Sequence, residues 1–256
     1  MKRYFDVLII GSGIAGLSSA LQIADKRKVA IIAKEEINNT NTLHAQGGVA
    51  TVIDKIDSYE KHIQDTLIAG DGLCNKEIVE MVISEGPNQI RSLLKWGVRF
   101  DKKKDGNFDL GKEGGHSKHR ILHYQDHTGA EIQKVLTEKV KKHPNITIFE
   151  KYFAIDIITQ HHLGVLVKRC FDNIEAFGAY VLNIKENTIE TFLANKIILA
   201  TGGIGNIYET TTNPEIATGD GIAMVYRAKG LIEGMEFVQF HPTALFNPNE
   251  KPAFLI

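Results

Sequence analysis

A glycine-rich turn between two apolar runs constrains this chain most strongly. Phe5–Ile10 (FDVLII) has the composition of a buried strand, and the turn GSGIAG follows it at once. Leu17–Ala24 then has helical spacing, and Val29–Ala33 (VAIIA) is a second apolar run. A strand, a helix and a second strand in this order predict a parallel sheet with a helix crossing one of its faces.

The turn has the spacing GxGxxG, in the context that gives this motif its meaning. Gly11 permits a tight turn, Gly13 lets the backbone approach a pyrophosphate, and Gly16 lets the helix pack closely on the strand. The helix N-terminus adds its positive end. The pattern predicts a dinucleotide site, and a glycine-rich turn without a ligand is the alternative. The predicted contacts are Gly11, Ser12, Gly13, Ile14, Ala15 and Gly16.

The residues after the second strand favour a flavin over a nicotinamide cofactor. An acidic residue that binds the ribose is expected about 20 residues after the glycines. This chain has Lys34 and then Glu35 there, so either residue could make the contact. Lys196–Gly203 (KIILATGG) is a further buried strand that runs into a glycine pair, similar to the second motif of flavoproteins with two dinucleotide-binding domains.

The remaining chain alternates between helical and strand patterns. Helices are predicted at Ser58–Gly70, Asn75–Trp96, Asp126–His143 and Gly219–Lys229. Strands of an antiparallel meander are predicted at Ile146–Phe149, Phe153–Ile158, Val165–Cys170 and Ala176–Asn183. A turn at Asn187 and a strand at Thr188–Leu193 follow. Asn38–Thr51 and Phe100–His119 are predicted to be loops.

Composition excludes several classes of protein. Thirty basic and 31 acidic residues give a net charge of -1, which does not indicate a nucleic-acid surface. No segment approaches the roughly 20 apolar residues of a membrane span. Cys74 and Cys170 lie far apart, as in a reduced protein without a disulfide framework. We therefore expect a soluble, cytoplasmic protein.

Six motifs together resemble one family. In chain order they are GSGIAG, HAQGGVA, KEGGHS, ILATGGIG, TTNPEIATGDGIAM and QFHPTA. This series resembles the succinate dehydrogenase/fumarate reductase flavoproteins and, among them, the L-aspartate oxidase subfamily. The resemblance implies an α/β fold: a Rossmann-like FAD-binding domain with a parallel sheet and an antiparallel meander over residues 1–235. It also implies the start of a capping domain at 236–256 and a longer parent chain, which the apolar end PAFLI also suggests.

The resemblance implies further flavin contacts and a non-covalent FAD. Asn41 stands five residues before Gln46, where covalent members of the family carry the histidine that is linked to the flavin. An amide cannot form that link, and His44 is offset from the position. Asp220 is implied as a flavin contact, and it could also cap the following helix. The implied contacts are Asn41, Thr42, Leu43, His44, Ala45, Gln46, Gly47, Gly48, Ala154, Ala200, Thr201, Gly202 and Asp220.

Glu113, in the stretch LGKEGGHSKHR, has three possible roles by residue type: metal ligand, acid or base, or partner of a cationic substrate group. The resemblance favours the third, because the dicarboxylate enzymes of the family carry an apolar aromatic residue there. Aspartate differs from succinate by an ammonium group, and a buried cation needs a counter-charge. His116 is expected near the same pocket. A solvated loop carboxylate is the alternative for Glu113.

Two other polar groups are candidate sites. The series HxxHxxxHxxxH could bind a metal, but no cysteine lies nearby and glycines interrupt a single helix, so no metal is expected. In QFHPTA, alternation would place Gln239, His241 and Thr243 on one face of an extended segment and Phe240 on the other. Amide and imidazole donors suit a carboxylate, and the resemblance implies that they bind the substrate carboxylates.

The resemblance thus implies oxidation of L-aspartate to iminoaspartate with FAD, and reoxidation by O2 or fumarate. This is the first step of de novo NAD biosynthesis, with quinolinate synthase as the consumer of the product. The family's proton-transferring arginine would lie beyond Ile256. Alternatives are a soluble fumarate reductase or succinate-oxidising enzyme, a non-catalytic flavin-binding fragment, and an NAD(P)H module that rests on GSGIAG alone.

Overall fold

The computed structural model describes residues 1–169, 173–241, 243–245, 247 and 253. The chain divides into two compact units. The first consists of Met1–His44 and Leu136–Ile256, and the second of Ala45–Val135. The second unit begins at Ala45, the second residue of the HAQGGVA motif, and it ends at Val135, inside the helix Thr128–Lys142. The expected division at residue 235 into a flavin domain and the start of a cap stays a prediction.

The first unit contains a six-stranded sheet with the order β6-β2-β1-β9-β8-β7. β1 is central and parallel to both β2 and β9, and β2 is parallel to β6. β7, β8 and β9 form an antiparallel meander, so the predicted combination of a parallel sheet and a meander is confirmed. The strands are β1 (Lys2–Ile10), β2 (Val29–Ala33), β6 (Ile146–Glu150), β7 (Tyr152–Thr159), β8 (Ala176–Asn183) and β9 (Thr188–Leu199).

The parallel strands end together at one edge of the sheet. All five residues of β2 are buried, as are the last four of β1. Their register pairs Ile10 with Ile32 on one side and with Leu199 on the other. Since a ligand of an open α/β sheet binds outside the carboxyl ends of the strands, this register determines which loops can form the site.

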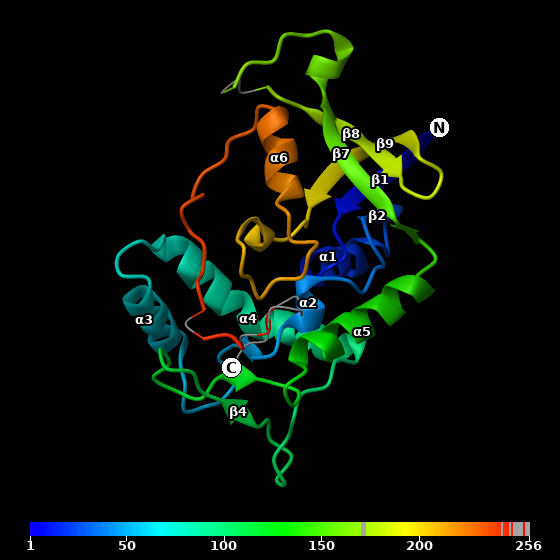
Figure 1. Ribbon diagram of the computed structural model, residues 1–256. Helices are drawn as coiled ribbons and strands as arrows, with labels where there is room; N and C mark the ends of the chain where they lie inside the picture. Colours follow the sequence, from blue (N-terminus) through cyan, green and yellow to red (C-terminus); the bar gives the residue numbers. More distant parts are fainter. Residues whose placement is uncertain (170–172, 242, 246, 248–252, 254–256) are drawn as a thin grey trace. The chain divides into compact units, whose positions relative to one another are not determined.

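Helices and aromatic side chains cover this sheet. α1 (Ile14–Ile23) packs against β1 and β2, and α6 (Asp220–Arg227) packs against β7 (Figure 1). In the core, the rings of Phe149 and Phe192 meet edge to face with centroids 4.9 Å apart, and Phe5 stacks on Phe192 at 6.3 Å. Edge-to-face and offset rings add to the burial of their apolar area.

Two strand predictions were wrong. Ile146–Phe149 belongs to β6, which is parallel to β2 and not part of the meander. Only Lys151, with φ +63°, separates β6 from β7, although the two strands stand at opposite ends of the strand order. Residues 165–169 of the expected strand Val165–Cys170 form no strand, and Cys170 lies outside the described residues. A local sequence pattern shows that a segment can form a strand, but it does not show with which other strand the segment pairs.

Other boundaries differ in smaller ways. Thr188–Leu193 and Lys196–Ala200 were expected as separate strands, but β9 runs through Asn195 without a break. Asn187 forms the predicted turn with φ +51°. The segment Asn38–Thr51 was expected to lack regular structure, yet it contains α2 (Asn41–His44) and β3 (Val49–Ala50). Both elements are too short to show a hydrophobic period.

The second unit combines two packed helices with a small antiparallel sheet of order β3-β5-β4. α3 and α4 lie side by side (Figure 1), and their N-termini are capped by Ser58 and Asn75, which accept hydrogen bonds from Lys61 N and Ile78 N. Gly97, with φ 104°, ends α4. The elements are α3 (Tyr59–Ala69), α4 (Lys76–Trp96), β4 (Leu110–Gly111), β5 (Ile121–Leu122) and the beginning of α5 (Thr128–Lys142).

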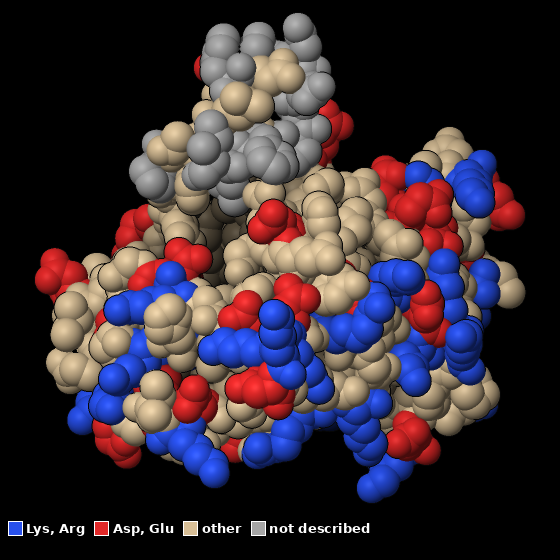
Figure 2. Space-filling view, turned by 90° about the horizontal axis from the view of Figure 1, so that it is seen from below, with Lys and Arg blue, Asp and Glu red and all other residues tan. Residues whose placement is uncertain are grey.

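Surface charge agrees with the balanced composition. Figure 2 shows basic and acidic side chains interspersed on the face in view, without a broad area of one sign. Within the part of the chain that the structure describes, no helix has the length and apolar character needed to cross a membrane.

Replacing Phe192 tests the aromatic core. Phe192 is fully buried against Phe149 and Phe5, so Phe192→Ala should lower the free energy of unfolding by about 3–5 kcal/mol. Urea denaturation followed by circular dichroism measures this change. Ile189→Ala on the same strand is the control, because Ile189 is exposed and its truncation should cost less than about 0.5 kcal/mol. Equal losses in both variants would contradict this assignment of the core.

Candidate functional site

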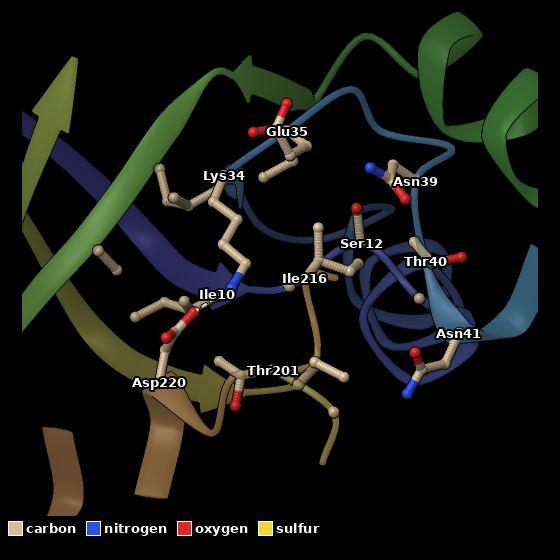
Figure 3. Close-up of a pocket in the computed structure, with 18 of the residues that line it drawn as sticks. Ile10, Ser12, Lys34, Glu35, Asn39, Thr40, Asn41, Thr201, Ile216 and Asp220 are labelled. Carbon is tan, nitrogen blue, oxygen red and sulfur yellow. Dashed lines mark hydrogen bonds and ion pairs between the residues drawn. The ribbon is translucent and has the colours of Figure 1, made fainter. Parts of the chain in front are cut away.

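A cavity of about 420 Å³ opens at the carboxyl edge of the parallel strands, within the first unit (Figure 3). Loops that follow β1, β2 and β9 form most of its wall, as the strand register requires. The lining residues are Ile10–Ala15, Ile32–Glu36, Asn39–Thr42, Tyr152–Ala154, Leu199–Gly202, Ile216, Ala217, Asp220 and Met224. Many of the predicted cofactor contacts are therefore brought together in one cavity.

Close backbone contacts require Gly11 and Gly16 of GSGIAG. Gly11 has φ +116°, and a Cβ there would lie 2.1 Å from the Ala200 carbonyl oxygen. A Cβ on Gly16 would lie 2.1 Å from the carbonyl oxygen of Gly11. At Gly13 a Cβ would meet only Thr42 Oγ1, at 3.2 Å, and would otherwise project into the space where a ligand approaches.

The first turn of α1 is suited to an anion. Its N-cap residue is Gly13, which has no side chain to cap the helix, and the first turn contains no acidic residue. Thr42 Oγ1 accepts a hydrogen bond from Ile14 N at 3.0 Å, which ties the segment after β2 to this turn. Amide N–H groups and the helix dipole then face the cavity, which is the chemistry that a pyrophosphate needs. The residues present fit a dinucleotide.

Lys34 and Asp220 form an ion pair in the cavity wall. Lys34 Nζ lies 2.5 Å from Asp220 Oδ2 and 2.7 Å from Thr218 Oγ1, and Figure 3 shows the lysine side chain reaching toward Asp220. Asp220 does not cap α6, so that prediction was wrong. The N-cap is Gly219, with φ 73°, and no side chain caps the helix. The carboxylate instead accepts from Lys34 and Thr218.

Glu35 lies away from Lys34 and pairs with Lys151. The hydrogen bond to Glu35 raises the pKa of Lys151. Both candidates for the ribose contact thus have a protein partner of opposite charge. Which of the two binds a ribose hydroxyl stays a prediction.

Several lining residues were not found from the sequence. Asn39 and Thr40 lie in the loop that follows β2, and their polar character in a loop after a predicted strand was the available signal. Ile216, Ala217 and Met224 lie inside the motif TTNPEIATGDGIAM, of which only Asp220 had been selected. Tyr152 and Phe153 gave no signal, because apolar residues in a strand are ordinarily part of the core.

Glu113 lies in a tight turn of the second unit. Its backbone N–H donates to His116 Nδ1 at 3.4 Å, and His116 N donates to the Glu113 carbonyl oxygen at 3.0 Å. A Cβ on Gly47 would lie 3.9 Å from Glu113 Oε1, so the EGGHS and AQGG motifs meet here. Glu113 is exposed and His116 is half-buried. Two motifs far apart in sequence thus place a carboxylate beside a glycine backbone.

A buried ion cluster of Arg120 with Asp57 and Asp65 holds the chain that follows this turn. The side chain of Arg120 is fully buried, and its Nε and Nη2 each donate to Asp57 at 2.9 Å. Arg120 Nη1 donates to Asp65 at 2.6 Å, and Asp65 also accepts from Ser117 N and Oγ at 2.7 and 2.8 Å. Burial raises the pKa of Asp65, but the hydrogen bonds from Ser117 and Arg120 outweigh it and lower the pKa to about 2. No sequence pattern indicated this cluster.

The other histidines of the series have separate partners. His119 Nδ1 lies 3.0 Å from the Leu110 carbonyl oxygen, and His123 Nδ1 lies 3.3 Å from Asp101 Oδ2. His127 N donates to the Tyr124 carbonyl oxygen. Over the described residues, no three His, Cys, Asp or Glu side chains are grouped in a way that could hold a metal ion.

Gln239 and His241 line a second cavity of the first unit, of about 940 Å³. Phe240 lines it as well, so the expected alternation of faces is wrong at this segment, which is irregular rather than extended in a strand. Thr243 is not among the lining residues, but its carbonyl oxygen lies 2.7 Å from His241 Nδ1. Pro242, between them, lies outside the described residues.

Comparisons with known proteins identify the relatives of this chain. The family described as FAD binding domain matches residues 6–256. L-aspartate oxidase of Acinetobacter baylyi is 48% identical over 99% of this chain and 46% of its own length. The chloroplastic L-aspartate oxidase of Arabidopsis thaliana is 48% identical over 95% of this chain and 36% of its own length. The chain therefore spans less than half the length of these relatives.

Solved structures give the same fold. A variant of E. coli quinol fumarate reductase FrdA superposes with a TM-score of 0.85 at 31% identity, over 96% of this chain and 40% of that chain. A Mycobacterium smegmatis Sdh1 complex superposes with a TM-score of 0.79 at 28% identity, over 89% of this chain and 39% of that chain.

Gly13→Ala tests the dinucleotide cradle. The backbone of Gly13 suits alanine and the added Cβ meets only Thr42 Oγ1, so the protein should fold with nearly unchanged thermal stability. FAD affinity should fall at least tenfold, because the methyl group occupies the approach of the pyrophosphate. Titration of flavin fluorescence measures the affinity. Gly114→Ala is the control, since no atom lies within 4 Å of its added Cβ. Unchanged FAD affinity in Gly13→Ala would exclude this cradle.

Asp65→Asn tests the buried charge cluster by its pH dependence. The pKa of Asp65 is lowered from 3.8 to about 2, so its ionised form contributes stability above pH 4 that is lost as the pH falls toward 2. The variant should be less stable at neutral pH, and its stability should vary less between pH 4 and 2. Urea unfolding at a series of pH values measures both. Parallel curves for the variant and the unaltered protein would contradict the assigned pKa.

Proposed function

Because the chain belongs to the FAD-binding domain family, we propose that it is the flavin-binding part of an enzyme that oxidises L-aspartate to iminoaspartate. One observation carries the proposal. The carboxylate of Glu113 is exposed and lies beside the Gly47 backbone, where two motifs meet. Relatives named L-aspartate oxidase, 48% identical over nearly the whole chain, support it.

When bound, FAD accepts the two electrons of the oxidation, and the protein supplies binding, orientation and charge. Gly13 and the first turn of α1 bind the pyrophosphate, and Lys34 or Glu35 binds the ribose. Asn41 makes the cofactor non-covalent, because its amide nitrogen is not a nucleophile; Nδ2 instead donates to Asn213 Oδ1 at 3.2 Å. Further proposed contacts are Thr42–Gly48, Ala154, Ala200, Thr201, Gly202 and Asp220.

Glu113 is proposed to bind the substrate ammonium group. Leaving an ammonium group in a closed site without a counter-charge costs several kcal/mol, whereas a carboxylate in contact with it offsets that cost. Gln239, His241 and Thr243 are proposed to bind the substrate carboxylates, and the amide and imidazole that line the second cavity suit an anionic oxygen. Dicarboxylates share those groups with aspartate, so Glu113 is the residue that favours the amine.

We also propose an electron acceptor, a consumer of the product and a cellular compartment. The electron acceptor is O2 or fumarate, and the unstable imine passes to quinolinate synthase in de novo NAD biosynthesis. Two cysteines in 256 residues fit a reducing compartment such as the cytoplasm.

A soluble fumarate reductase or succinate-oxidising enzyme is the second candidate. The superposition on a fumarate reductase, with a TM-score of 0.85, favours it. The two candidates share the flavin site and differ at the residue that meets the substrate amine, so Glu113 discriminates between them.

Glu113→Gln in the full-length, FAD-loaded protein tests the proposal. Loss of the charge should lower kcat/KM for L-aspartate roughly 30- to 1,000-fold, the effect of about 2–4 kcal/mol for an unpaired cation. Reduction of fumarate, which has no ammonium group, should change little. Glu138→Gln is the control, because Glu138 is an exposed carboxylate on α5. A parallel loss of both activities, or no loss of either, would refute the role of Glu113.

A further inference from the structure

A buried histidine beside the Glu113 turn has no assigned role. His62, on α3, is only 9% exposed, and its Nδ1 is buried without a hydrogen-bond partner among the described residues. A buried polar atom left unpaired destabilises the folded protein. We therefore looked for a group near His62 that could be its hydrogen-bond partner, and the neighbouring ring provides one.

The ring next to His62 is that of His116. Their centroids are 6.1 Å apart and the rings meet edge to face at 86°. His116 Nδ1 accepts the hydrogen bond from Glu113 N. A neutral imidazole that accepts at Nδ1 carries its proton on Nε2. The Nε2–H group of His116 is therefore a hydrogen-bond donor, and the neighbouring Nδ1 of His62 is a nitrogen without a hydrogen-bond partner in the described part of the chain.

α3 holds the turn at a second point. His62 and Asp65 are three residues apart and share one face of the helix. Asp65 accepts from Ser117 and from Arg120, so the chain just after His116 is fixed to α3. The position of the Glu113 turn relative to His62 is thus determined by charged hydrogen bonds.

The surroundings of His62 favour its neutral form. Burial lowers its pKa, and the nearby Arg120 and His116 lower it further, while Asp57 and Asp65 act in the opposite direction. A neutral ring retains a nitrogen that can accept a hydrogen bond, which a protonated ring would not.

We propose that His62 is a positioning residue: through one bridging water, its Nδ1 accepts the Nε2 proton of His116 and so fixes the tautomer of His116 that accepts from Glu113 N–H. The Glu113 carboxylate is then held in one orientation for the substrate ammonium group. This step rests on the proposed function, but the tautomer of His116 can be measured independently of any activity.

Two variants of His62 distinguish the effect of losing its hydrogen-bond acceptor from the effect of losing its ring. His62→Phe keeps a ring against His116 but has no acceptor, and His62→Asn restores an acceptor near the position of Nδ1. In the full-length, FAD-loaded protein, 15N NMR of labelled imidazoles should show one His116 tautomer, with the proton on Nε2. His62→Phe should give a mixture of tautomers and raise KM for L-aspartate about three- to tenfold, the effect of one lost hydrogen bond. His62→Asn should restore both.

His161→Phe is the matched control, because His161 also meets a second histidine ring, at 5.8 Å, but on the exposed helix Gln160–Leu163. It should change neither readout. An unchanged His116 tautomer in His62→Phe, or the same defects in His62→Asn, would overturn the inference. If the unaltered protein oxidises no L-aspartate, the proposed function fails, and the tautomer measurement still decides the role of His62.

Discussion

The site of the first unit depends on one close contact, where the turn after β1 meets the end of β9. The hydrogen atom of Gly11 occupies the place where any Cβ would lie 2.1 Å from the Ala200 carbonyl oxygen. This contact follows from the parallel pairing of β1 with β9, which brings Ile10 level with Leu199, and β2 ends at the same level on the other side. The cavity, the position of the first turn of α1 and the ion pair between Lys34 and Asp220 all follow from that arrangement.

The second unit depends on a different interaction, the buried ion cluster of Arg120 with Asp57 and Asp65. Removing these charges from water is costly, so the cluster is weak evidence for a gain in stability. Its consequence is geometric. Because Arg120 and Ser117 both bind Asp65, the turn that carries Glu113 is fixed to α3, and the carboxylate lies beside Gly47. A substrate-binding group on a loop needs such support to keep its orientation.

The sequence predicted those features that local chemistry determines. β1, the glycine turn, α1 and β2 follow each other within 33 residues, and each has its own pattern, so their assembly could be inferred. The partner of β6 could not, because pairing with β2 brings together residues more than a hundred positions apart. The same limit applies to Asp220, whose partner Lys34 is 186 residues away and replaces the predicted cap. Arg120 resembled any charged loop residue until its two aspartates were found.

The central claim is that the enzyme selects a substrate with an amino group, and reduction of the flavin tests this most directly. The full-length protein is loaded with FAD, oxygen is removed, and L-aspartate or succinate is added while the visible flavin band is recorded. If Glu113 selects the amine, L-aspartate bleaches the band and succinate bleaches it little or not at all. Bleaching by succinate alone would contradict it, and would assign the protein to the dicarboxylate enzymes, with no role for Glu113 in selecting the substrate.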